Sequence, residues 1–432
     1  MMLSIRSIIL AGVITFRAAA AESATDAQIA KTSSMVAAKP QSAVAWSRHG
    51  DALMQKGRET GDASYANLAE SAYRKTLAIS PKSVDALVGL AWASGVRHEF
   101  ESSIEWAKKA LAFDTKNSAA YGLIGDAAVE LGDYERAFDE YQKMLDISPD
   151  LSSYGRSAHL LYITGDNKRA SLLMWKAIQA GSPYAENTAW CRAQLALIQF
   201  SQGAYVPAAA LLEEGLRLSP NDHRLLAAMG KVTAAGKNYA QAIEYYKKAL
   251  LVTPDQETIA ALGDLYTLTG KKDEAAKQYD LVEVIAKVNR ANGVLGDLST
   301  ARFYADHDRK IAEGLKLAEH EYRTRPNVFA ADTLAWSHFK NGNIAEAKRF
   351  ITYALRKGTS EASFQYHKGM IDAADGHPSE AKLALYSAMS INPGFDPIQS
   401  SIAIKTLAGL GGSVAAQAGV QPGSSSVRTS SK

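Results

Sequence analysis

The 432-residue chain has little of several features that mark particular classes of protein. It contains one cysteine, Cys191, so no disulfide can form within the chain. Beyond the N-terminal segment it has no apolar run of the roughly 20 residues that a membrane-spanning helix needs, which predicts no transmembrane span. The 48 Lys and Arg residues are interspersed with 45 Asp and Glu residues, and the net charge is +3. We therefore expect no nucleic-acid partner, because proteins that bind nucleic acids gather basic residues on one face.

The motifs of common enzymes are missing as well. The nine histidines are scattered, and no two have the H-E-x-x-H spacing that places two zinc ligands on one helical face. The chain has no G-x-S-x-G elbow, no Walker loop and no glycine-rich dinucleotide fingerprint. For the polar triplet Asp306, His307 and Asp308, a solvated turn is favoured over a weak cation site. The sequence therefore predicts no enzyme, no catalytic residue, no metal site and no cofactor.

What the chain does contain is an internal repeat. Pro220 and Pro254 are 34 residues apart, and Pro81 and Pro149 are separated by twice that distance. The same residue types occupy the same offsets between these prolines, which indicates a tandem array. In the unit 118–151, two segments with apolar residues at helical spacing flank a Gly-Asp turn. Each such helix has one apolar face, so a pair of helices can bury it only against neighbouring pairs.

This pattern resembles the tetratricopeptide repeat, with a small residue midway along the first helix, a Gly at the turn, an Ala early in the second helix and a Pro after it. The residues that carry the resemblance in the two best copies are Tyr121, Ile124, Gly125, Ala128, Gly132, Tyr134, Ala137, Tyr141 and Pro149, then Met229, Gly230, Gly236, Tyr239, Ala242, Tyr246, Ala249 and Pro254. Further copies begin near Leu262, Leu334 and Gly369, and degenerate ones fill the gaps. The resemblance implies an all-α fold, a right-handed α-solenoid of about ten helix-turn-helix repeats with a C-terminal capping helix.

Composition divides the chain into five segments. They are a signal peptide (1–21), a flexible leader (22–42), the solenoid (43–396), the capping helix (397–410) and a disordered tail (411–432). The signal peptide is predicted from Arg6, the short apolar run after it and the small residues before Glu22. A protein of the bacterial exported type, in the periplasm or secreted, is therefore expected. The alternative is a disordered N-terminus on a cytoplasmic protein.

By the resemblance, the first helices of the pairs line a concave groove in which a partner lies. Two aromatic clusters occupy groove positions, and aromatic residues dominate binding hot spots. The larger consists of Phe329, Asp332, Trp336, Phe339, Tyr366 and Met370, and the smaller of His159, Tyr162, Trp190 and Phe200. Asp332 is suited to a basic partner residue. The alternative is that rings such as Trp336 and Phe200 pack against the neighbouring pair, and the sequence leaves both open.

Charges also alternate along the groove, from Asp126 and Glu130 to Arg224 and Lys231, then to acidic positions again, although such charges are often only solvated. The Lys and Asn clamp with which some relatives hold a C-terminal carboxylate is missing, since Gly122 and Asp126 stand at one such pair of positions.

The leading hypothesis is a non-enzymatic protein-protein interaction scaffold or adaptor of the cell envelope, which binds a peptide or protein segment in the groove. The alternative is a glycan-binding component of envelope polysaccharide assembly or export, in which the same rings stack on sugars.

Overall fold

The computed structural model describes residues 24–182, 185–291 and 297–412, and within these ranges the chain forms 22 α-helices and no strand. Ten helix pairs follow one another along the chain. They are α3 (Ala43–Thr60) with α4 (Ser64–Ile79), α5 (Val84–Val96) with α6 (Phe100–Leu111), α7 (Ser118–Glu130) with α8 (Tyr134–Ile147), α9 (Leu151–Ile163) with α10 (Asn167–Ala180), α11 (Ala185–Ser201) with α12 (Tyr205–Leu218), α13 (His223–Ala235) with α14 (Tyr239–Val252), α15 (Gln256–Leu268) with α16 (Lys272–Ala291), α17 (Asp297–Asp306) with α18 (Ile311–Thr324), α19 (Val328–Lys340) with α20 (Ile344–Leu355), and α21 (Ala362–Ala374) with α22 (Pro378–Ile391). Helix α2 (Ala24–Ala38) precedes the pairs and α23 (Gln399–Gly409) follows them.

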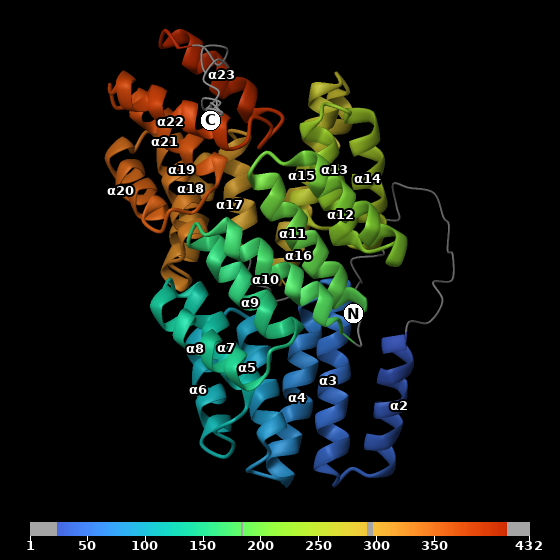
Figure 1. Ribbon diagram of the computed structural model, residues 1–432. Coiled ribbons are helices and arrows are strands. Elements are labelled where there is room, and N and C mark those ends of the chain that lie inside the picture. The colour runs from blue at the N-terminus through green and yellow to red at the C-terminus, as the bar shows by residue number, and fades with distance from the viewer. Residues whose placement is uncertain (1–23, 183–184, 292–296, 413–432) are drawn as a thin grey trace, which may run out of the picture.

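Each helix packs against its own partner, the second helix of each pair packs against the helix that follows it, and the first helices of most consecutive pairs also touch. The ribbon shows this stacking, from α3 and α4 at one end, through the green α9 to α13, to the orange and red helices α18 to α23 (Figure 1). The prediction of an all-α solenoid of about ten pairs with a C-terminal capping helix is confirmed.

Tight contacts between glycine and tyrosine hold the two helices of a pair together. The ring of Tyr141 on α8 lies directly against Gly125 of α7, where an added Cβ atom would stand 2.3 Å from the ring. Ala137 is completely buried one turn earlier on α8, where a larger side chain would push the helices apart. The same glycine-tyrosine contact recurs in other pairs, as Gly50 with Tyr73, Gly230 with Tyr246, and Gly263 with Tyr279. The repeated small residues are therefore explained by helix crossing.

Helix pairs that are five positions apart along the chain also touch. The turn inside the earlier pair contacts the loop that follows the later pair. In the third pair, the backbone N–H of Val328 donates to the phenolic oxygen of Tyr134 at 3.0 Å, and the amide of Asn327 donates to Glu130 at 2.8 Å. Figure 1 shows the end of α18 beside the turn between α7 and α8. We call this row of contacts the inter-turn seam.

The inter-turn seam continues through the next pairs with the same offset. The turn of the fourth pair contacts the loop after α20, where Gly165 faces the backbone carbonyl of Gly358. In the fifth pair, the side-chain amide of Asn392 donates to the carbonyl of Phe200 at 2.7 Å, and the backbone N–H of Gly394 donates to Tyr205 at 2.8 Å. Since the contacts recur at successive pairs, one turn of the superhelix rests on the next.

The segment 22–42 differs from the predicted flexible leader, because most of it forms α2 and packs on α3. Ile29 packs against the core, but several contacts are polar: Thr32 is completely buried, with its hydroxyl 3.0 Å from Nδ1 of His49, and Asp26 pairs with Lys56 at 2.6 Å. A composition rich in Ala, Ser and Thr led to the wrong expectation because this interface uses few large apolar residues. The predicted signal peptide (1–21) and nearly all of the predicted tail lie outside the described residues.

Candidate functional site

The larger predicted cluster is packed into the core. Asp332 has no exposed surface, and Trp336 and Tyr366 are each 2% exposed. The indole of Trp336 stacks on the rings of Phe339 and His367, with centroids 4.8 and 4.2 Å apart. Phe329 and Met370 pack against the same core clusters and are partly buried. For Trp336, Tyr366 and Asp332 the structure therefore favours packing, and their surfaces do not lie open to a partner.

A buried polar network fixes this cluster. Asp332 accepts a hydrogen bond from Arg302 at 3.2 Å and lies 2.8 Å from Nδ1 of His367. The neighbouring carboxylate of Asp306 accepts from the indole N–H of Trp336 at 2.8 Å and from Gln399 at 2.6 Å. The carboxylate of Asp332 is already bonded inside the protein, so it does not select a basic residue of a partner as the sequence had led us to expect.

The polar triplet is also drawn into these internal contacts. His307 lies 2.7 Å from the carboxylate of Asp264 on α15, and Lys340 donates to Asp308 at 2.8 Å. These bonds join α17 to its neighbours, so the triplet is not simply a solvated turn. Among the described residues, no group of His, Cys, Asp or Glu has an arrangement that would hold a metal ion.

The smaller cluster keeps part of its surface accessible. Arg156, His159 and Tyr162 follow one another at intervals of three along α9, so they share one face of that helix. All three are partly exposed, as is Trp190 on α11. Gly155 makes room for the indole, since an added Cβ atom would lie 3.4 Å from it. Phe200, in contrast, is 4% exposed and belongs to the core.

Helix α13 adds positive charge to the same wall. The ammonium group of Lys231 lies 5.2 Å from the ring centroid of Phe200, and the side chain is exposed. Within the described part of the chain, no carboxylate lies in ion-pair distance of Lys231, whereas Arg224 pairs with Asp222 at 2.6 Å. We define the inner-wall site as Arg156, His159, Tyr162, Trp190 and Lys231.

Two groups from elsewhere in the chain reach this wall. Arg58 of α3 approaches Glu186 at the start of α11, with 3.8 Å between nitrogen and oxygen. Glu361, which lies 199 residues after Tyr162 and just before α21, accepts a hydrogen bond from the Tyr162 hydroxyl. Burial raises the pKa of Glu361 and lowers the pKa of His159. Sequence reasoning noted Lys231 but missed Glu361, because no local pattern links it to α9.

Cys191 beside Trp190 is completely buried, and burial raises the pKa of its thiol to about 12. Thiolate is the reactive form, so this side chain is an inert apolar residue.

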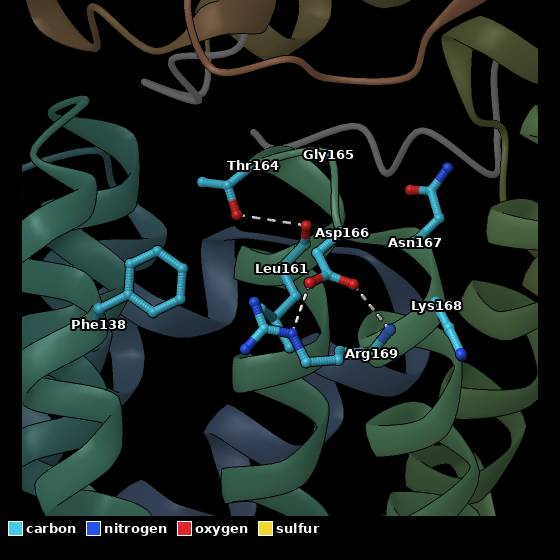
Figure 2. Close-up of a pocket in the computed structure, with 8 residues that line it drawn as sticks. All are labelled: Phe138, Leu161, Thr164, Gly165, Asp166, Asn167, Lys168 and Arg169. Atoms are coloured by element: carbon cyan, nitrogen blue, oxygen red, sulfur yellow. Dashed lines mark hydrogen bonds and ion pairs between the residues drawn. The ribbon is translucent and has the colours of Figure 1, made fainter.

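Two cavities lie away from the inner-wall site. The larger, about 450 Å³, is an open depression between Phe138 on α8 and the turn that joins α9 to α10. Figure 2 shows Phe138 on one side and Lys168 on the other, with the carboxylate of Asp166 bonded to Arg169 between them. The smaller, about 230 Å³, lies between α3 and α4. Across the described ranges, no helix has both the length and the apolar character needed to cross a bilayer.

Comparison with known proteins agrees with this architecture. The model of the tetratricopeptide repeat family matches residues 118–151 and 223–256. A curated relative, the BBSome complex member BBS4 of Bos taurus, is 24% identical over 177 residues, which are 40% of this chain and 32% of the relative. The chain thus spans about a third of the length of that relative.

Solved structures extend the likeness. The human IFIT1 dimer with m7Gppp-AAAA has a TM-score of 0.52 at 16% identity, over 76% of each chain, which shows a shared fold. Pseudomonas aeruginosa PilF aligns with 52% of this chain and 97% of its own, at 20% identity and a TM-score of 0.40. Proteins built from tetratricopeptide repeats generally act as protein-interaction scaffolds. The two segments that match the tetratricopeptide repeat model, 118–151 and 223–256, are thus the third and sixth of ten consecutive helix pairs in the described residues.

Proposed function

We propose that this protein is a non-enzymatic interaction scaffold or adaptor that holds a peptide or protein segment against the wall formed by α9, α11 and α13. One observation carries this proposal. Of the two aromatic clusters on first helices, the one at His159, Tyr162 and Trp190 keeps accessible surface, whereas Trp336 and Tyr366 are core residues. Partly exposed Trp and Tyr side chains on a rigid helical wall provide contact area with little loss of side-chain entropy on binding.

The buried cluster has a different role in this proposal. Trp336, Asp332 and His367 lock α17, α19 and α21 together through stacking and hydrogen bonds. A wall that is already rigid loses less conformational freedom when a partner binds. Trp336 and Tyr366, two of the rings on which the glycan hypothesis relied, are buried in the core, and no feature of the structure favours that hypothesis.

The binding proposal is tested by comparing two tryptophan variants in quantitative cross-linking from envelope extracts. Trp190→Ala removes the indole from the inner-wall site, whereas Trp175→Ala removes a 39%-exposed indole from α10, a second helix of a pair. We expect specific partners to be depleted with the first variant and retained with the second. Equal recovery with both variants, at unchanged helical content, would contradict a binding role for this wall.

We also propose that the protein acts outside the cytoplasm, in the cell envelope. The support is the N-terminal sequence, in which Arg6, a short apolar run and small residues precede Glu22. Fractionation and N-terminal sequencing test this directly. A mature chain that begins near Glu22 in the exported fraction is expected, and an unprocessed chain in the cytoplasm is the opposite outcome.

A further inference from the structure

We propose that the inner-wall site recognises an acidic segment of its partner, and that Glu361 occupies the place of one partner carboxylate while the partner is absent. The inference rests on the proposed scaffold function and adds the chemistry of the segment that is held. It is carried by three features of the structure: the origin of Glu361, the unpaired charge of Lys231, and the partly exposed rings of the inner-wall site.

Glu361 comes to the site from across the inter-turn seam. It is the residue that precedes α21, a position where Asp, Asn or Ser usually caps the helix with its side chain. Glu361 makes no such capping bond, and its carboxylate instead accepts the hydroxyl hydrogen of Tyr162 on α9. A carboxylate bound to the inner-wall site is therefore already present in the molecule, supplied by the protein itself.

The charges on the wall favour a further anion. Three arginines of this wall each pair with a carboxylate of the same superhelical turn: Arg58 with Glu186, Arg156 with Asp126, and Arg224 with Asp222. Lys231, in contrast, has no ion-pair partner among the described residues. The positive charges of Lys231 and Arg302 attract the carboxylate of Glu361. Lys231 therefore remains available to a further anion.

The internal carboxylate is held in an unfavourable place. Burial and the neighbouring charge of Asp332 both raise the pKa of Glu361, although the hydrogen bond from Tyr162 opposes them. A carboxylate that moves from such a site into water regains its hydration. Release of Glu361 therefore offsets part of the cost when a partner carboxylate takes over the bond to Tyr162 and the attraction of Lys231.

The remaining groups of the site fit a peptide rather than an isolated anion. His159 lies one turn before Tyr162 on α9 and Trp190 lies against Gly155 of the same helix, and both rings are partly exposed and offer contact to the stems of side chains. Because burial lowers the pKa of His159, its ring is neutral at pH 7 and contributes no further cation. We thus expect a segment with several Asp or Glu residues to bind through its side chains and not through a terminal carboxylate.

The test uses the full chain and two fluorescein-labelled peptides with amidated C-termini, decaglutamate and decalysine, with binding followed by fluorescence anisotropy. Decaglutamate should bind and decalysine should not, and raising the salt concentration should weaken the binding. Glu361→Gln should bind decaglutamate about threefold to tenfold more tightly, because the competing charge is lost. Lys231→Met should bind it more weakly by a similar factor.

A lysine elsewhere in the same pair provides the control. Lys248 on α14 is also exposed, and Lys248→Met should leave the affinity unchanged. Circular dichroism checks that each variant is folded. The inference is wrong if decaglutamate fails to bind both the wild type and Glu361→Gln, if Glu361→Gln brings no gain, or if decalysine binds equally well.

The outcomes also separate this inference from the scaffold proposal. Should a partner be captured in a Trp190-dependent way that decaglutamate does not compete with, the scaffold stands and the acidic chemistry is wrong. Should Trp190→Ala have no effect on capture and decaglutamate fail to bind, both proposals are wrong.

Discussion

The backbone N–H of Val328 donates a hydrogen bond of 3.0 Å to the phenolic oxygen of Tyr134, which precedes it by 194 residues. Both residues are almost fully buried, at 0% and 1% exposure. In a simple repeat array each unit contacts only its neighbours. This pair instead joins the start of α8 to the start of α19, so two successive turns of the superhelix are fastened together.

Replacement of Tyr134 by Phe should lower the free energy of unfolding by about 1–3 kcal/mol, because the N–H of Val328 would be buried without an acceptor. Urea denaturation followed by circular dichroism measures the change. Tyr121→Phe is the control, since the Tyr121 hydroxyl donates to the Thr115 carbonyl at an exposed position. A loss no larger than that of the control would show that the seam bond does not contribute to stability.

Two glycine variants distinguish the effect of packing at the inter-turn seam on stability from the effect of backbone strain in a turn. Gly165 and Gly270 both have positive φ angles, 84° and 78°, so Ala at either position costs about 1 kcal/mol in backbone strain. An added Cβ atom at Gly165 would stand 2.4 Å from the carbonyl oxygen of Gly358, whereas Gly270 has nothing within 4 Å. Gly165→Ala should therefore destabilise the fold by about 1–3 kcal/mol more than Gly270→Ala. Equal unfolding midpoints for the two variants would argue against a tightly packed seam.

The crossing point of the sixth pair is open to a similar comparison. Ala242 on α14 has no exposed surface, and Ala242→Asp should cost several kcal/mol, on the order of 3–5, through overpacking and a buried unpaired charge. Ala240→Asp, at an exposed position on the same helix, should be nearly neutral. Thermal unfolding of the two variants measures the difference, and a similar melting temperature for both would contradict the assigned crossing.

Asp396 should make the stability depend on pH. Burial, followed by repulsion from Asp264, raises its pKa to about 6, although its carboxylate accepts the backbone N–H groups of Ile398 and Gln399 at the start of α23. A carboxyl group whose pKa is higher in the folded than in the unfolded state favours folding when it is protonated. Its unfavourable contribution is therefore present above pH 6 and disappears as the pH falls toward its ordinary pKa near 4.

The matching variant is Asp396→Asn, which keeps a capping oxygen but does not titrate. We expect it to melt at a higher temperature than the wild type at pH 7.5, with the difference shrinking as the pH falls to 5. The comparison with the variant is needed because other groups also titrate in this range: His307 and Glu361 have raised pKa values, and His159 a lowered one. A constant difference across this range would refute the role given to Asp396.

Much of the fold was predictable because its units are local. The spacing of residues such as Gly125, Ala137 and Tyr141 reports which faces of two adjacent helices meet, and both helices lie within one repeat. Helix α2 was not predictable in the same way. Its buried contacts are made by residues such as Thr32, and residues of this type are also common in flexible segments.

The candidate site was harder to predict for a geometric reason. The sequence identifies which positions of a repeat face the groove. It does not show which of these side chains form hydrogen bonds with side chains of the neighbouring repeats. Asp332 meets Arg302 and His367, which are 30 and 35 residues away, close to one repeat on either side. That spacing was a usable signal, and it would have marked Asp332 as internally paired. The approach of Glu361 to Tyr162 depends on the rise of the whole superhelix, which no single repeat encodes.

The bond between Asn392 and the carbonyl of Phe200 has a mechanical consequence. A linear stack of hairpins frays from its free end one hairpin at a time. Here the last hairpin is tied to one in the middle of the array, so peeling it away also strips a partner from a hairpin five places earlier. Several helix pairs at once would therefore resist a force applied to the two ends of the solenoid.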